Sequence, residues 1–319
     1  MGAHSMVRRF GAALPVLVFA VGVALAADPA AVITEIHPAT GEVRVKMADE
    51  AEWKVPRPLL TLRPGDLVRV TGDGHVVVLL TGGRGIQTVT QANSPFTVTG
   101  MATAGPVERA RGVVSSVTAF LAGQQRERTY QSLSIRSARP QPAVIIGPRD
   151  TAVLIGRPIF EWTGPSQARY RLVLYGPHGL VWEQADLPLA PVAYPASAPA
   201  LAPGTKYRWE LQTPRASMQQ ALFEVVTTAD DRRIRDALEV LTATQMPSYP
   251  SSTLVVMRAG LLLQEGLVHD ARRELLAAIA ERDEATLEQL LGRAYDRVGL
   301  THLAGDAFAR AADLAAGDR

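Results

Sequence analysis

The 319-residue sequence contains no cysteine, so disulfide bonds cannot stabilise it and thiol chemistry is excluded. It also lacks the H-E-x-x-H pattern of metalloproteases, the G-x-S-x-G pattern of serine hydrolases and the P-loop of nucleotide-binding proteins. A metal site needs ligands that converge. The histidines after residue 26 instead occur singly, without ligand spacing, at His37, His75, His178, His269 and His302. We therefore predict no enzymatic activity, no catalytic residue, no metal site and no cofactor.

The sequence has little net charge. It contains 33 basic and 31 acidic residues, and two of the basic ones, Arg8 and Arg9, lie in the N-terminal leader described next. The rest of the chain is therefore close to neutral. Nonspecific binding to nucleic acid requires clustered positive charge that releases counterions, so the sequence predicts no nucleic-acid partner. Its 47% hydrophobic and 20% charged residues are typical of a globular protein.

The N-terminal apolar run is shorter than the roughly 20 residues that a membrane-spanning helix requires. Arg8 and Arg9 precede this run, which extends from Phe10 to Val23, and the small-residue sequence Ala24-Leu25-Ala26 follows it. This order is typical of a secretory signal. Residues 1–26 are therefore predicted to be a cleaved signal peptide, which places the mature protein in the periplasm or outside the cell. The alternative is an uncleaved segment that anchors the chain, and this is the single membrane contact that we expect.

Residues 28–105 are predicted to form a β domain. Short runs of partly alternating hydrophobicity, such as residues 32–36 and 42–46, are separated by turn-forming residues. Thr71-Gly72-Asp73-Gly74 has the composition of a tight hairpin turn and precedes the apolar run from His75 to Leu80. In residues 106–142 the pattern changes, because apolar residues between 106 and 122 recur at helical spacing. We expect an amphipathic helix there, followed by a linker.

Residues 143–228 return to strict alternation. Tyr170, Leu172 and Leu174 share one face of a predicted strand, with arginines on the other face, and the run from Lys206 to Leu211 repeats this pattern. Such alternation is typical of strands half buried in an antiparallel sheet. With about six short strands in this region, we expect a β-sandwich.

Residues 229–319 are predicted to be helical and contain an internal repeat. Five positions recur 33 residues later: Ala259, Leu262, Ala271, Leu275 and Ala278 correspond to Gly292, Tyr295, Ala304, Phe308 and Ala311. Small residues let paired helices approach closely, and large ones fill the groove between them. This pattern resembles the tetratricopeptide repeat, although the period is 33 instead of 34 and Asp283 replaces the closing proline. The resemblance implies two stacked helical hairpins, with a helix at Asp231 to Thr242 as a cap.

Two further resemblances concern the β regions. Residues 62–98 resemble a FecR-type domain through Gly65-Asp66, Thr71-Gly72, Gly74 and the apolar strand Val76 to Leu80. Residues 158–162 and 201–209 resemble fibronectin type III-like sandwiches. FecR-type domains are extracytoplasmic modules linked to signalling or envelope functions, and none of these resemblances implies catalytic residues. The expected fold is therefore multidomain, with all-β N-terminal and central domains and an all-α helical-repeat C-terminal domain.

The tetratricopeptide resemblance implies a binding site. In that family the first helix of each repeat lines a concave groove. By register, the groove residues here are Thr253, Gly260 and Gln264 from the first copy and Gln289, Arg293 and Arg297 from the second. Arg293 and Arg297 lie on one helical face, where they would hold a partner's carboxylate; in the alternative, the face is solvated and they pair with neighbouring acids. We expect an exported, non-enzymatic scaffold or adaptor that binds a protein or peptide partner in the cell envelope.

Two other functions stay open. The first is binding of a glycan or peptidoglycan through a stacking platform formed by Trp162, Trp182 and Trp209, of which Trp182 is the one expected to be exposed. The second is an unrecognised hydrolase built from scattered carboxylates such as Asp66, Asp73 and Glu161. That function requires two of these carboxylates to converge in one cleft.

Overall fold

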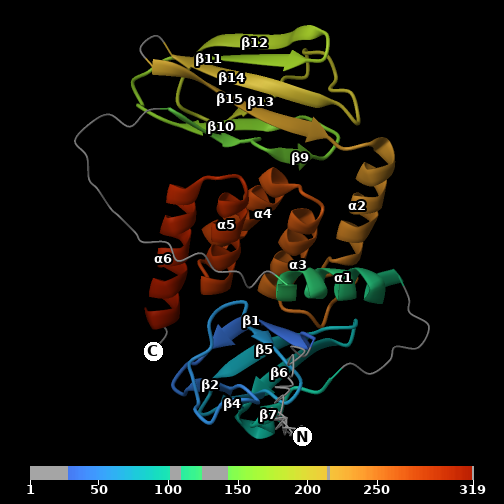
Figure 1. The fold of residues 1–319 in the computed structure, drawn as a ribbon, viewed down its shortest axis with the longest axis vertical. Helices are drawn as coiled ribbons and strands as arrows, with labels where there is room; N and C mark the ends of the chain where they lie inside the picture. The colour runs from blue at the N-terminus through green and yellow to red at the C-terminus, as the bar shows by residue number, and fades with distance from the viewer. Residues whose placement is uncertain (1–27, 101–108, 124–142, 214–215, 318–319) are drawn as a thin grey trace, which may run out of the picture.

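The computed structural model describes residues 28–100, 109–123, 143–213 and 216–317. The predicted signal peptide at residues 1–26 and the linker at 124–142 lie outside the described residues. As predicted, antiparallel sheets form the N-terminal and central regions, and helices form the C-terminal region. Figure 1 shows the helices as a middle layer, with the N-terminal sheets on one side and the central sheets on the other. The last segment of the chain therefore lies between the two β regions.

The N-terminal region contains two antiparallel sheets. The first has the order β3–β1–β5–β6, with bounds Thr61–Leu62, Ala31–His37, His75–Leu80 and Gly85–Thr90. The second has the order β2–β4–β7, with bounds Val43–Lys46, Leu67–Val70 and Phe96–Thr97, and a short 3₁₀ helix, η1 (Gln91–Asn93), precedes β7. Residues 71–74 form a turn between β4 and β5, but these strands belong to different sheets, so the prediction of a hairpin there is wrong. Gly72 adopts a φ of 62° there and lies against Gly41, where neither backbone leaves room for a Cβ atom.

Strands β1 and β5 are buried on both faces. Ile33 and Val78 face the core shared by the two N-terminal sheets, whereas Val32 and Leu79 join the core of the helical layer. A strand covered on both faces has a continuous apolar sequence instead of an alternating one. This explains why residues 75–80 form an uninterrupted apolar run.

The central region also contains two sheets around one core. A three-stranded sheet has the order β13–β10–β8, with bounds Val192–Ala193, Ile159–Thr163 and Val144–Gly147. A five-stranded sheet has the order β12–β11–β14–β15–β9, with bounds Gly179–Leu187, Tyr170–Gly176, Lys206–Thr213, Ala216–Val225 and Thr151–Val153. The predicted alternation is confirmed, since Tyr170, Leu172 and Leu174 are buried and Arg171 is exposed. Trp209 is fully buried and donates its indole N–H to the carbonyl of Pro148 at 2.7 Å.

Five helices form the C-terminal layer. They are α2 (Thr228–Val240), α3 (Ser251–Gln264), α4 (Val268–Glu281), α5 (Ala285–Arg297) and α6 (Thr301–Gly317). Short connections make α3 with α4, and α5 with α6, neighbouring pairs. A Cβ atom on Gly292 would lie 2.5 Å from the ring of Phe308, so glycine is required where α5 meets α6. Within the described residues, no helix is both long and apolar enough to cross a membrane.

The predicted amphipathic helix is present as α1 (Arg109–Gly123) and packs across α3. Val117 and Leu121 of α1 are fully buried, and both lie 3.1 Å from the position that a Cβ atom of Gly260 would occupy. The hydroxyl of Thr61 in β3 donates to the carbonyl of Ala122 at 3.1 Å. Helix α1 therefore joins the N-terminal region to the face of α3.

Polar contacts join the helical layer to the central region. The hydroxyl of Thr151 and the N–H of Ala152 donate to the carbonyl of Gly266 at 3.0 and 3.1 Å. Arg272 of α4 forms a buried ion pair with Glu161 of β10. A charged pair enclosed by protein needs good geometry to offset its lost hydration, and this pair lies where α4 meets β10.

Two neighbouring ionisable groups in α4 have pKa values shifted toward their neutral forms. Burial, assisted by the charge of Arg273, lowers the pKa of His269 to about 4, so this imidazole is neutral at pH 7. Burial raises the pKa of Asp270 to about 6, although the carboxylate accepts a hydrogen bond from the N–H of Leu154. Both groups lie where α4 meets the central region, and they contribute to the packing of that contact.

Candidate functional site

A cavity of about 420 Å³ lies between the N-terminal sheets and the helical layer. Its walls come from the turn after β1, the segment at residues 55–58, the connection between α4 and α5, and the end of α6. Its apolar lining includes Ile36, Val43, Val55, Pro56, Pro58 and Leu314. Val55 at this site is one of four large apolar residues that are exposed in the described part of the chain, at 41%.

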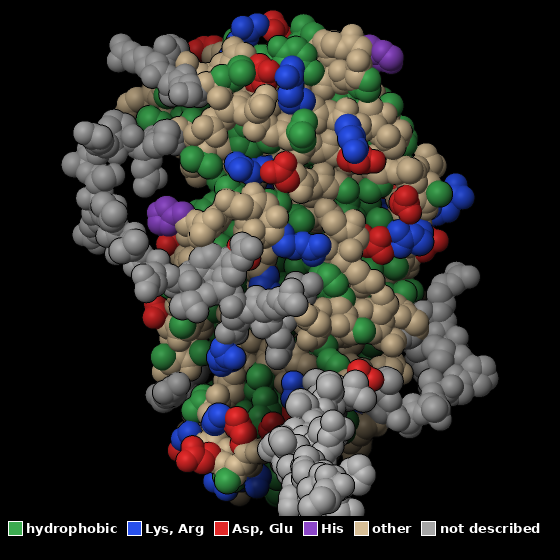
Figure 2. Space-filling model, viewed as in Figure 1, with side chains coloured by type: hydrophobic (Ala, Val, Ile, Leu, Met, Phe, Trp, Pro, Cys, Tyr) green, Lys and Arg blue, Asp and Glu red, His purple; other side chains and the backbone are tan. Residues whose placement is uncertain are grey.

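Charged side chains line the cavity as well, and several are paired within the chain. Arg44 lies 3.3 Å from Glu42, and Arg282 lies 3.4 Å from Glu284. Glu284 also accepts a hydrogen bond from the hydroxyl of Ser252 at 2.7 Å. Figure 2 likewise shows acidic and basic side chains interspersed over the described part of one face. The apolar part of the lining is therefore the part that offers new contacts to a ligand.

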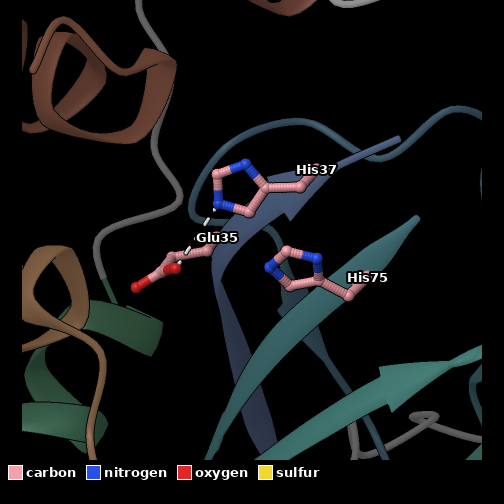
Figure 3. Close-up of side chains that lie close together, drawn as sticks. All are labelled: Glu35, His37 and His75. Atoms are coloured by element: carbon pink, nitrogen blue, oxygen red, sulfur yellow. Dashed lines mark ion pairs between the residues drawn. The ribbon is translucent and has the colours of Figure 1, made fainter. Parts of the chain in front are cut away.

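One end of the cavity carries a cluster of Glu35, His37 and His75. Glu35 and His37 lie two residues apart in β1 and so point to the same side, and His75 is the direct partner of His37 in β5. The Nε2 atom of His37 lies 3.5 Å from Oε2 of Glu35, and the two imidazole rings stack with centroids 4.5 Å apart. Figure 3 shows the three side chains together, with Glu35 and His37 pointing toward each other. One ligand atom from each residue lies within 4.8 Å of the others.

Glu35 also caps a helix in the next layer. Its Oε1 atom accepts hydrogen bonds from the N–H of Thr253 at 2.9 Å and from the hydroxyl of Thr253 at 2.6 Å. Thr253 is the third residue of α3, whose first N–H groups have no partners within the helix. The residue before α3 is Pro250, which supplies no side-chain cap. A carboxylate from β1 thus takes the place of a local capping residue.

The electrostatics of the cluster follow from these contacts. Burial alone would raise the pKa of Glu35, but the hydrogen bonds from His37 and Thr253 outweigh burial and hold the pKa below its ordinary value. Burial and the neighbouring charge of His37 lower the pKa of His75, although Glu35 opposes this shift. At neutral pH the cluster therefore presents a carboxylate beside a neutral imidazole at His75.

The predicted groove residues in α3 are covered by the chain itself. Thr253 is fully buried against β1, and Gly260 lies beneath α1. The amide of Gln264 donates to the hydroxyl of Ser116 in α1 at 2.7 Å. The prediction that these positions line an open groove is wrong for Thr253 and Gly260. The physical reason is that the apolar faces of α1 and β1 needed a partner, and α3 provides it.

The predicted groove residues in α5 lie apart from the cavity lining. Arg297 donates to the carbonyl of Leu263 at 2.6 Å and stacks over the ring of Phe120 in α1. Burial lowers the pKa of Arg297. Gln289 and Arg293 are half-buried. Arg297 therefore supports the contact between α5 and α1, and a role of Gln289 and Arg293 in binding a partner stays a prediction.

The residues of the two alternative functions do not assemble into sites in the described structure. Trp162 and Trp209 are buried, and Trp182 is half-buried, with its ring packed against Phe160 and Tyr194. No stacking platform for a sugar is formed by these three tryptophans. The three carboxylates also lie apart: Asp66 accepts N–H bonds from Ala48 and Arg63 in a turn, Asp73 lies in the turn between β4 and β5, and Glu161 pairs with Arg272.

The histidine cluster was missed by sequence reasoning, which treated each histidine as isolated. A Glu-x-His sequence in a strand places both side chains on one face, and this was the available local signal. The third member depends on β1 pairing with β5 in one particular register. Nothing in local periodicity specifies such a long-range register.

Comparisons with known proteins give no identification. The chain matches no known protein-family model, and its search against curated proteins finds no significant match.

We expect the Glu35 contact to contribute measurably to stability. Glu35→Ala leaves the buried N–H of Thr253 without its acceptor, whereas the hydroxyl of Thr253 still lies 3.1 Å from that of Thr34. The free energy of unfolding should therefore fall by about 2–3 kcal/mol. Glu35→Gln retains an acceptor oxygen and should lose about 1 kcal/mol. Urea denaturation measures both values. Glu42→Ala, at a solvent-exposed ion pair nearby, is the matched control and should change little; equal losses in all three variants would contradict the capping role.

Proposed function

We propose that this protein is an exported, non-enzymatic adaptor that binds a protein partner in the cell envelope. The proposal of export is supported by the signal-like sequence of residues 1–26. The proposal of binding without catalysis is supported by the scattered positions of Asp66, Asp73 and Glu161 and by the lack of a nucleophile motif in the sequence. Its compartment is the periplasm or the exterior.

We further propose that α3 to α6 are two tetratricopeptide-like repeats. The repeated small positions Ala259, Ala271, Ala304 and Ala311 are all buried, as close helix packing requires. Gly292 and Phe308 make the small-to-large contact that the repeat pattern implies. We also propose that the N-terminal region is a FecR-like domain and that the central region is a fibronectin type III-like domain. The turn at residues 71–74 supports the first assignment, and the two sheets around one core support the second.

The proposed partner site is the cavity between the N-terminal sheets and the helical layer, in place of the covered face of α3. The observation that carries this choice is the exposed side chain of Val55 beside a cavity whose lining includes the partly exposed Ile36, Pro58 and Leu314. Apolar side chains exposed together at a concave site are typical of protein-binding surfaces. Because Arg44 and Arg282 already have acidic partners, we propose that the partner inserts a short apolar segment instead of a charged one.

Site-specific photo-crosslinking tests this proposal. A photoreactive residue is placed at Val55 in the full chain, and a matched one at Leu180, which is 59% exposed in the central region. We expect a discrete cross-linked partner from envelope fractions at Val55 and none at Leu180. Leu314→Asp on the opposite wall should abolish the product, and binding is then measured with the purified partner. Identical products at both positions, or products unaffected by Leu314→Asp, would contradict the site.

A further inference from the structure

We propose that Glu35, His37 and His75 form a binding site for a divalent transition-metal ion, and specifically for Zn²⁺. Two imidazole nitrogens and one carboxylate oxygen are a donor set that zinc accepts in proteins. Hard cations such as Mg²⁺ and Ca²⁺ prefer all-oxygen sites, so this set favours zinc over them. The proposal is independent of the adaptor function, because it concerns only the ligand cluster.

One distance in the cluster already fits a tetrahedral ion. Zinc binds imidazole nitrogen and carboxylate oxygen at about 2.0–2.2 Å, so two ligand atoms of a tetrahedral site lie about 3.3 Å apart. Oε2 of Glu35 and Nε2 of His37 are 3.5 Å apart. The ligand atom of His75 lies within 4.8 Å of both, so zinc binding would require this partly exposed ring to rotate toward them.

The surroundings hold the carboxylate in the required orientation. Thr253 occupies Oε1 of Glu35 through two hydrogen bonds, which leaves Oε2 directed at His37. Hydrogen bonds of this kind orient metal ligands in known sites. Four carboxylates line the cavity, and three of them pair with arginines: Glu42 with Arg44, Glu284 with Arg282 and Asp283 with Arg310. Glu35 is the carboxylate of this lining that remains to bind a cation.

Three protein ligands leave a fourth coordination position. Glu35 and His37 both line the cavity, so this position opens toward it and is accessible from solvent. A bound ion would tie β1 and β5 to each other and, through the second oxygen of Glu35, to the first turn of α3. Zinc should therefore stabilise the contact between the N-terminal sheets and the helical layer.

The test is zinc binding by the tag-free full chain after treatment with a chelator. We expect one Zn²⁺ per chain by calorimetry, with metal content counted after desalting, and an increase in melting temperature that Mg²⁺ does not produce. His37→Ala and His75→Ala should each weaken binding by at least about 100-fold, and Thr253→Ala by roughly 10-fold, because its backbone N–H still orients Glu35. His178→Ala removes an exposed histidine outside the cluster and should bind as the unchanged chain does.

The outcomes separate a metal site from an ordinary ion pair. Circular dichroism of the metal-free variants checks folding, and His37→Asn and His75→Gln replace any alanine variant that does not fold. Absence of bound zinc in the folded chain would overturn the proposal. Zinc binding that survives in both folded His37 and His75 variants would overturn it as well, because the ion would then lie elsewhere.

Discussion

Replacing Arg272 by methionine is expected to lower the free energy of unfolding by about 3–5 kcal/mol, the largest effect that we predict for a single substitution. Arg272 is 5% exposed and pairs with Glu161 across the contact between α4 and β10. Without its partner, the carboxylate of Glu161 stays enclosed as an uncompensated charge. Urea denaturation at pH 7 measures this loss.

A double variant separates the cost of the orphaned charge from the value of the pair. Arg272→Met combined with Glu161→Met should recover most of the stability, because an apolar pair of similar volume replaces both charges. Arg273→Met changes the adjacent, exposed arginine and is the matched control, with little expected effect. A double variant as unstable as Arg272→Met alone would show that lost packing, and not the buried charge, causes the effect.

Leu121→Ala is expected to lower the free energy of unfolding by about 2–5 kcal/mol. Leu121 is fully buried in α1 and packs against α3 where Gly260 leaves space. Removing its side chain creates a cavity between the two helices, and the backbone of α3 cannot move to fill it without disturbing the core. Chemical denaturation followed by circular dichroism measures the loss.

The same helix supplies the control for this prediction. Ser116→Ala removes an exposed hydroxyl that accepts a hydrogen bond from Gln264, and the change should be within about 0.5 kcal/mol. If Leu121→Ala behaved like Ser116→Ala, helix α1 would not be packed on α3 in solution. The groove that the sequence predicted along α3 would then be open.

The secondary structure could largely be predicted from the sequence, because its signals are local. Alternation at Tyr170, Leu172 and Leu174 predicted a strand with the correct buried face. The recurrence of small and large residues at a spacing of 33 predicted the positions at which α5 meets α6, including Gly292 against Phe308. In both cases the period of the pattern matches the geometry of one element or one helical pair.

The arrangement of the regions could not be predicted in the same way. The contact between Glu35 and Thr253 joins residues 218 positions apart, and neither residue type signals the other. Likewise, the pairing of His37 with His75 depends on the register between β1 and β5. Periodicity states which face of an element is apolar but not which other element covers it. The groove prediction failed at Thr253 for this reason.

The placement of the last helices between the two β regions affects how the chain folds during synthesis. Val32 and Leu79 of the N-terminal sheets and Ile146 of the central region are covered only when the C-terminal helical layer is in place. The apolar surface of strands that are synthesised early therefore stays exposed to solvent until the C-terminal helices have been synthesised and have packed against it. The C-terminal helices therefore complete the packing of both β regions. Truncated chains that lack these helices would be prone to self-association before they bind a partner.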